Sequence, residues 1–481
     1  MSIQRFLPKL YEILASMNYN TERIDLLQEV LRIYLKNPVP DFEVATTARK
    51  INDGQRKTDL KEKTEALGSN NTLTADFWFQ QDDLLSSNIF QEYIPEYVQA
   101  KYGPFGKHFV DQFELRIEAP FLLGFKLAEY LEFKKNNAGF QDEVHRFTSK
   151  EQYADRGFVS IPPPDYLRMY ANVVTINKDE LTRIVSGLVS PSEVKKILDI
   201  ISIDIRLPLT DEKLRFVTHP LLKIDDTLLV LTPRYVTRSI PFVYEGLCRQ
   251  IKSFNDSKGK AFENLVQDTV KYLPFQSLAF NKIYGSAYDV DAIVEFPNSI
   301  WFVEVSSHPP SLRSLQGDTK AIKTDLKKAI NKCIFQGRRC FAHEKSEALS
   351  PYFRQRNKKK AVLIVLDGVY PQLNPSGMIK FFDENIPVYV INWFDLRHLV
   401  DQPELPMFEN FLLWRIRRPM PVFGIDEGDY WGFYFDHFVK DPRMREAFST
   451  MQERHIGLTF ISGRFSDKRY LEKIAPTKDS R

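Results

Sequence analysis

Four polar residues interrupt two apolar segments of the chain at a spacing suited to metal chemistry. Asp289 and Asp291 lie two residues apart in YDVDAIVEF (288–296), and Glu304 and Ser306 lie two apart in WFVEVSS (301–307). Residues two apart in a β-strand point to the same face. A carboxylate in a buried strand costs several kcal/mol unless it is paired or bound to a metal. Carboxylates converging from adjacent strands suit Mg²⁺ or Mn²⁺, which activates water and stabilises charge on a phosphodiester.

The segments around these residues predict the elements that must position them. Apolar residues on one side of 261–273 predict a helix, and two β-rich runs at 278–284 and 288–296, separated by Gly-Ser, predict a hairpin. A third strand is expected over 300–306. A helix is expected from about 318 to 337, with Asp318 as its N-cap. Two more strands, 361–366 and 386–392, complete an α/β core with a mixed sheet.

In this order the segments GKAFENLV (259–266), YDVDAIVEF and WFVEVSSHPP resemble the PD-(D/E)XK, or restriction-endonuclease-like, nuclease superfamily. Downstream, Gln316-Gly317-Asp318, DLKKAI (325–330) and Gln336 stand where that group often has an Arg-Gly-Asp loop and a helix ending in Gln. The resemblance covers roughly 255–400. It implies a restriction-endonuclease-like core and a nuclease that depends on Mg²⁺ or Mn²⁺.

The resemblance also implies roles for individual residues. Metal ligation is expected from Asp291, Glu304, Glu263 and Asp289, and the expected catalytic set is Asp291, Glu304, Ser306 and Gln336. Ser306 occupies the position of the family's Lys, which orients the attacking water and stabilises developing charge, and a hydroxyl cannot supply that charge. The replacement candidates are Lys282, Lys320, Lys323, Lys327 and His308.

Each of these residues also has a structural interpretation. Asp289 fits turn chemistry after Gly-Ser, and Asp291 with Glu304 fits an exposed edge pair. Glu263 fits a surface or capping carboxylate, and Gln336 fits packing at the margin of a helix. The sequence leaves these alternatives open.

The charge distribution supports a polyanionic partner independently. The whole chain has a net charge of +3, but residues 305–360 contain 14 Lys and Arg against 4 Asp and Glu, so this segment carries +10 and the remainder −7. A basic segment beside a metal site suits a phosphate backbone. The predicted nucleic-acid-binding residues are Lys320, Lys323, Lys327, Arg338, Arg339, Arg354 and Arg356.

Composition and motifs exclude several other classes. Hydrophobic residues make up 43% and charged residues 27%, which is typical of a globular protein and not of a disordered one. The three cysteines form no metal-spaced pair or disulfide framework, which favours a reducing, cytoplasmic compartment. We find no secretory signal, no membrane-length apolar run, no phosphate-binding G-x-x-x-x-G-K-[ST] loop and no H-E-x-x-H pair. No membrane partner is expected.

With 481 residues, the chain is expected to form several domains. We predict a mostly helical domain over 1–160, a mixed α/β connection over 161–252, the nuclease-like domain over 253–400 and an α/β extension over 401–481. The first hypothesis is a metal-dependent nuclease acting on DNA, in a setting of prokaryotic defence or mobile elements. The second is a catalytically inactive nuclease-like module that binds nucleic acid or a partner protein. A partner protein or a second copy of the chain could also complete the site.

Overall fold

The computed structural model describes a defined set of segments of the chain. These are residues 91–137, 175–204, 219–224, 226–230, 233–283, 289–311, 321, 324–325, 327–368, 386–417, 422–423, 427–446 and 458–459. Within these segments, no helix is long and apolar enough to cross a membrane. The sequence also predicts a helix after residue 20, an exposed polar stretch over 47–74 and a boundary at 161–166, and all three lie outside the described residues.

The chain divides into two compact units, and each is built from segments that are separate in the sequence. Unit 1 comprises Met1–Thr72, Phe79–Ser86 and Gly103–Ile251. Unit 2 comprises Leu73–Trp78, Ser87–Tyr102 and Lys252–Arg481. Each unit holds a mixed sheet with helices, which confirms the predicted α/β class.

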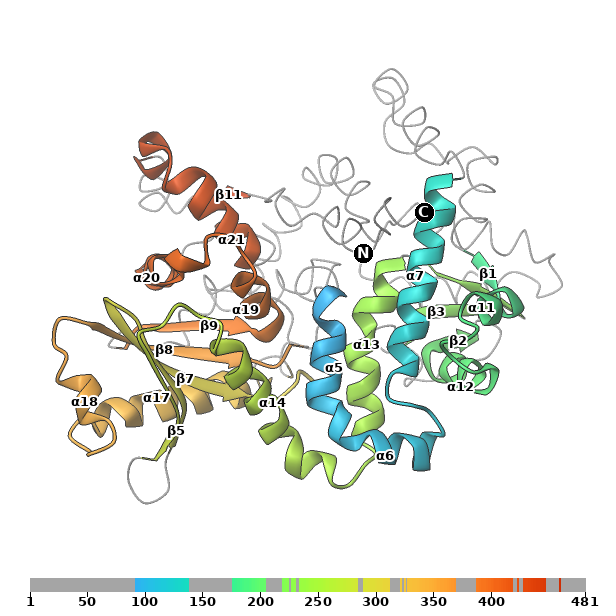
Figure 1. Ribbon diagram of the computed structural model, residues 1–481, viewed down its shortest axis with the longest axis horizontal. Helices are drawn as coiled ribbons and strands as arrows, with labels where there is room; N and C mark the ends of the chain where they lie inside the picture. Colours follow the sequence, from blue (N-terminus) through green and yellow to red (C-terminus); the bar gives the residue numbers. More distant parts are fainter. Residues whose placement is uncertain are drawn as a thin grey trace, which may run out of the picture. The chain divides into compact units, whose positions relative to one another are not determined.

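Unit 1 is a small sheet with helices (Figure 1). Its sheet has the order β1-β4-β3-β2, with two antiparallel pairings and a parallel β2–β3 pairing. The segment 219–236 predicts two strands around Asp225-Asp226, and they are confirmed as β3 and β4. The elements are η2 (Gly103–Phe105), α6 (Gly106–His108), η3 (Phe109–Phe113), α7 (Ala119–Asn137), β1 (Thr175–Asn177), α11 (Lys178–Ile184), α12 (Pro191–Ile201), β2 (Ser202–Asp204), β3 (Leu221–Ile224), β4 (Thr227–Leu229) and α13 (Pro233–Cys248).

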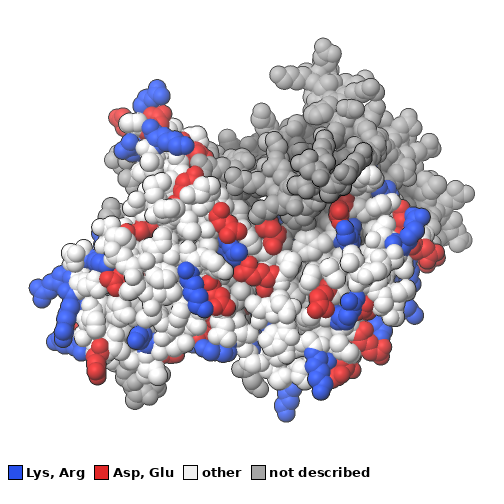
Figure 2. Space-filling model, in the orientation of Figure 1, with Lys and Arg blue, Asp and Glu red and all other residues white. Residues whose placement is uncertain are grey.

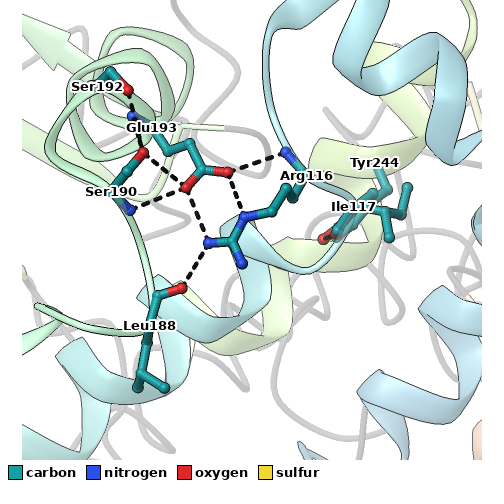
Figure 3. Close-up of polar contacts among 7 residues, drawn as sticks. All are labelled: Arg116, Ile117, Leu188, Ser190, Ser192, Glu193 and Tyr244. Carbon is teal, nitrogen blue, oxygen red and sulfur yellow. Dashed lines mark hydrogen bonds and ion pairs between the residues drawn. The ribbon is translucent and has the colours of Figure 1, made fainter.

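A buried carboxylate fixes the start of α12 in unit 1 (Figure 3). Ser190 and Glu193 form a capping box, in which Ser190 Oγ accepts the Glu193 N–H and Glu193 Oε2 accepts the Ser190 N–H. Arg116 forms a bidentate ion pair with the same carboxylate, with its Nε 2.9 Å from Oε1 and its Nη2 3.0 Å from Oε2. These bonds hold the pKa of Glu193 at about 2, since the Arg116 side chain is the largest influence and Ser190 adds to it.

Unit 2 contains the predicted core (Figure 1). Its sheet has the order β5-β6-β7-β8-β9, antiparallel from β5 to β7 and parallel from β7 to β9. A two-stranded parallel pair, β10–β11, is separate. The elements are η1 (Gln91–Tyr93), α5 (Ile94–Tyr102), α14 (Phe254–Val270), β5 (Ser277–Ile283), β6 (Asp289–Glu295), β7 (Ser299–Ser306), η5 (Lys327–Asn331), α17 (Lys332–Ala342), α18 (Ser350–Phe353), β8 (Lys359–Leu366), β9 (Val388–Asn392), α19 (Trp393–Val400), η8 (Leu405–Met407), α20 (Phe408–Arg417), β10 (Val422–Phe423), α21 (Glu427–Phe433), η9 (Tyr434–Phe438) and β11 (Leu458–Thr459).

Helix α17 lies along one face of the unit 2 sheet (Figure 1). The side chains of β6 and β7 on this face include Ile293 and Phe302, which form one cluster with Cys340 of α17. The Phe302 ring also contacts Phe341 and stacks on Phe353 of α18 at 5.3 Å. This apolar contact holds α17 directly over the acidic positions of the two strands.

The opposite face of the sheet is tied to α5 by a buried ion pair. Asp367 continues β8, and its N–H donates to Ser306 O at the end of β7. Its carboxylate accepts from Lys101 Nζ at 2.7 Å and from the Tyr97 hydroxyl. The Lys101 ammonium also lies 6.0 Å from the centre of the Phe262 ring of α14. Because Lys101 and Asp367 are fully buried, α5 is an integral part of unit 2.

Two predicted helix ends are wrong. The helix expected from residue 261 begins earlier, at Phe254, where the apolar side of α14 starts with a fully buried ring. The helix predicted to end near Gly337 continues to Ala342, since Cys340 still packs on the sheet. Of the predicted helical region 1–160, the described part, 91–137, is helical apart from the short turn before Ala119.

Candidate active site

The two central carboxylates lie where β6 and β7 separate. The β6–β7 ladder runs from Glu295–Ile300 to Ala292–Val303. Continuing this register by one step places Asp291 opposite Glu304 on the same face. Beyond the last paired position, Asp291 Oδ2 accepts the N–H of Val305 at 2.7 Å, so this side chain satisfies a backbone donor of β7. Antiparallel register therefore brings together the two acids that the sequence singled out.

Glu304 is a fully buried acid, with no solvent exposure. Cys340 Sγ lies 4.0 Å from Glu304 Oε1, and Glu304 Oε2 has no hydrogen-bond partner among the residues that the structure describes. A buried oxygen without a partner is costly, because the hydrogen bonds it made with water are not replaced. The exposed-edge interpretation of Asp291 and Glu304 is therefore wrong for Glu304.

Burial and mutual repulsion favour the neutral forms of both acids. Burial raises the pKa of Asp291 to about 7, and the charges of Glu263 and Asp289 add to this, while the Val305 N–H opposes it. Burial also raises the pKa of Glu304 well above its usual value, followed by the charges of Asp291 and Asp289, with Lys332 opposing. Both carboxyls lie in an environment that disfavours their charge unless a cation enters.

Helix α14 closes one side of this site through Glu263 and Gln267. Glu263 accepts from Lys260 Nζ at 2.5 Å, and Gln267 Nε2 lies 3.1 Å from Glu263 Oε1. The same Gln267 amide donates to the backbone oxygen of Asp291 and lies 3.1 Å from Asn281 Oδ1. Gln267 thus joins α14 to β5 and β6 behind the carboxylates. The sequence reasoning missed Gln267, although its position one turn after Glu263 on the predicted helix was a usable signal.

Helix α17 covers the other side of the site. Cys333 and Cys340 are buried seven residues apart, hence on one face, and the charges of Glu304 and Asp291 add to the burial that raises the pKa of Cys333. Between them, Gly337 lets the helix approach the sheet, since a Cβ there would lie 2.7 Å from Val362 Cγ2. The predicted Gln336 is half-buried on the same helix.

Ser306, which stands where the resemblance leads one to expect a Lys, has a buried side chain. Two of the proposed replacements are directed elsewhere: Lys282 is exposed and pairs with Val290, on the opposite face from Asp291, and His308 Nε2 lies 3.6 Å from Asp325 Oδ1. Lys320 and Lys323 lie outside the described residues, and Lys327 is exposed on η5. The charge of Lys332, a residue that the sequence did not point to, lowers the pKa of Glu304 against the larger effect of burial.

Asp291 and Glu304 fit a hard divalent cation as a donor pair. They present carboxylate oxygens from adjacent strands, and Glu304 Oε2 is the buried oxygen without a partner. In the described segments, no three His, Cys, Asp or Glu side chains form a metal-ligating group, so the four predicted ligands are not assembled as one set. Asp289 is exposed and Glu263 is bound to Lys260. Two carboxylates are still enough for Mg²⁺, which takes its remaining ligands from water and substrate phosphates.

The predicted nucleic-acid-binding residues differ in how exposed their side chains are. Arg354 and Arg356 are exposed, and Lys and Arg side chains gather at the left edge of unit 2, over α18 and its flanking segments (Figure 2). Arg338 is exposed and Arg339 half-buried on α17. Lys358, from the densest part of the basic segment, is instead bonded to Glu295 at 2.7 Å.

Comparison with protein-family models, with curated proteins and with the solved structures finds no match to the chain.

Proposed function

We propose that the chain is a divalent-metal-dependent nuclease that hydrolyses phosphodiester bonds of nucleic acid, with DNA as the expected substrate. The observation that carries the proposal is the pair Asp291 and Glu304, a half-buried and a fully buried acid opposite one another, in which Glu304 has an oxygen without a hydrogen-bond partner among the described residues. Strongly perturbed acids without a structural partner are typical of functional sites. The order of helix, three antiparallel strands, helix and parallel strand also agrees with the resemblance to the PD-(D/E)XK superfamily.

In this proposal Asp291 and Glu304 hold Mg²⁺ or Mn²⁺. The metal would supply an activated water and stabilise charge on the scissile phosphate. Gln267 and the Val305 N–H fix the backbone and one carboxylate oxygen of Asp291, so that the donor pair is preorganised. Lys332 contributes positive charge on the α17 side, where the family's Lys is replaced by Ser306.

A second candidate is a nuclease-like module that binds nucleic acid without cleaving it. The observations in its favour are the buried hydroxyl of Ser306 at the Lys position and the complete burial of Glu304 beneath α17. In this case the basic residues of α17, and Arg354 and Arg356 after α18, would bind phosphates, and the two acids would bind no metal.

Cleavage and binding assays on the full chain separate these functions. We expect cleavage of single-stranded or duplex DNA with Mg²⁺ or Mn²⁺, and loss of it in Asp291→Asn and Glu304→Gln with nucleic-acid binding retained. Asp268→Asn is the matched control, since this α14 carboxylate is exposed and paired with Lys271. Binding without cleavage by the highly purified wild-type protein, with any divalent metal and with DNA or RNA, would favour the second candidate.

A further inference from the structure

Helix α17 and the preceding η5 turn present a basic surface with an exposed aromatic ring. Residues 327–339 contain five Lys and Arg and no Asp or Glu. On α17, Lys332, Phe335 and Arg339 follow each other at spacings of three and four, which places them on one side of the helix. The buried cysteines of α17 occupy a different side, against the sheet.

Phe335 is not part of the core. Its side chain is 51% exposed, although it lies on a helix whose buried side is filled with apolar residues. The guanidinium of Arg339 lies 4.2 Å from the centre of its ring. An arginine stacked on an exposed aromatic ring holds the ring in place and leaves its other face for a planar ligand.

The lysines of this surface are also available. Lys327, Lys328 and Lys332 are exposed, and none of the three has an ion pair with a residue that the structure describes. Three lysines without an ion pair to any described residue, together with the aromatic ring, lie along η5 and α17, and they complement a ligand that carries both phosphates and planar bases. The adjacent Cys333 and Cys340 face Glu304, so the same helix bears this surface and covers the candidate site.

We propose that Lys328, Lys332, Phe335 and Arg339 form a binding surface for single-stranded nucleic acid, on which an unpaired base stacks against Phe335 while the lysines contact the flanking phosphates. This deepens the proposed nuclease function, because it names the strandedness of the substrate that α17 directs to the site. A base inside a duplex is stacked on both faces and cannot stack on Phe335, whereas every unpaired base has a free π-face. Duplex-specific recognition would instead require groove contacts.

The test measures binding separately from cleavage. Fluorescence anisotropy of the full chain in Ca²⁺ or EDTA would use a labelled mixed-sequence single strand of about 20 nucleotides, which exceeds a typical single-strand site size. We expect Phe335→Ala to weaken binding between about 5-fold and 100-fold, as the loss of one stacked base does. Phe335→Trp should retain or strengthen it. Lys332→Ala should lower the slope of log affinity against log salt by about 0.7, as the loss of one phosphate contact does.

Tyr272 provides the matched control. It is another exposed aromatic residue of unit 2, 62% exposed, with the Arg397 guanidinium 5.7 Å from its ring, and it follows the end of α14 away from Lys260 and Glu263. Tyr272→Ala should leave binding unchanged. An equal loss in both variants, no loss in Phe335→Ala, or equal affinity of wild type for a duplex would overturn the inference.

These outcomes are independent of the proposed chemistry. If Phe335→Ala weakens single-strand binding but the wild type cleaves nothing, the surface is retained and the nuclease proposal fails. If the wild type cleaves with Mg²⁺ and Phe335→Ala binds and cleaves normally, the nuclease proposal is retained and this surface is rejected.

Discussion

Removing the charge of Asp291 should stabilise the metal-free protein at high pH. Its pKa in the folded protein is about 7 against an ordinary 3.8, with burial as the main cause. This difference corresponds to about 4 kcal/mol, at about 1.4 kcal/mol for each pH unit. Asp291→Asn keeps an oxygen that can accept the Val305 N–H but carries no charge. The gain in unfolding free energy should approach 4 kcal/mol as an upper limit, since relaxation and water entry lower the cost of a buried charge.

The pH dependence gives the sign of the effect. Because the folded pKa lies above the unfolded one, the folded protein holds a proton that the unfolded chain has lost between pH 3.8 and about 7. The contribution of Asp291 to the stability of the wild type is therefore fully present below pH 3.8, and it is lost as pH rises through about 7. The advantage of Asp291→Asn should be largest at about pH 8 and fall below 1 kcal/mol near pH 4.

Tryptophan fluorescence in urea provides the assay. All five tryptophans, Trp78, Trp301, Trp393, Trp414 and Trp431, belong to unit 2, so the signal reports the unit that holds Asp291. Asp268→Asn, on the surface of α14, should change the midpoint little at either pH. Mg²⁺ should stabilise the wild type and not Asp291→Asn. A loss of stability in Asp291→Asn at about pH 8 would refute the reasoning, because it would make this carboxylate a structural hydrogen-bonding group.

Two further predictions concern buried charges outside the site. Lys101→Met should destabilise unit 2 by about 3–5 kcal/mol in the same urea assay, because it leaves the buried Asp367 carboxylate without its cation. Adding Asp367→Leu should recover most of this loss. Equal losses in the single and double variants would contradict the prediction. Glu193, with a folded pKa of about 2 against 4.5, contributes stability that is present above pH 4.5 and lost as pH falls toward 2. Since Arg116 is half exposed, this contribution should be about 1–2 kcal/mol, and hydrogen exchange in α12 should lose that pH dependence in Glu193→Gln.

The candidate site could be predicted from the sequence where its contacts are local. Period-two alternation in 288–296 and 300–306 sets the strand faces, and the turn between them sets the register, so Asp291 and Glu304 had to meet if the two strands paired. The helices before and after the strands were predicted for the same reason, since an apolar side repeating every three to four residues is a local signal.

Contacts between distant segments could not be predicted in this way. Lys101 and Asp367 are 266 residues apart, and neither has a neighbouring residue that marks it as a partner of the other. Lys358 belonged to the densest basic run, yet the antiparallel turn at the end of β6 brings it to Glu295. The role of Lys332 depends on the rotation of α17 about its axis, which the packing of Cys333, Gly337 and Cys340 on the sheet determines.

The balance of charge around the site is an argument for a divalent cation. Four carboxylates influence one another there, Asp291, Glu304, Glu263 and Asp289, against two lysines, Lys260 and Lys332. With every group ionised, these six residues carry a net charge of −2, which one Mg²⁺ or Mn²⁺ would neutralise. In the metal-free protein the raised pKa values of Asp291 and Glu304 reduce this charge by retaining protons instead. In the proposed metal-bound protein, protons and metal would compete for the same two carboxyls, because a metal's ligands must be deprotonated. Two acids with only a structural role would destabilise the fold here, because the environment disfavours the charge of both.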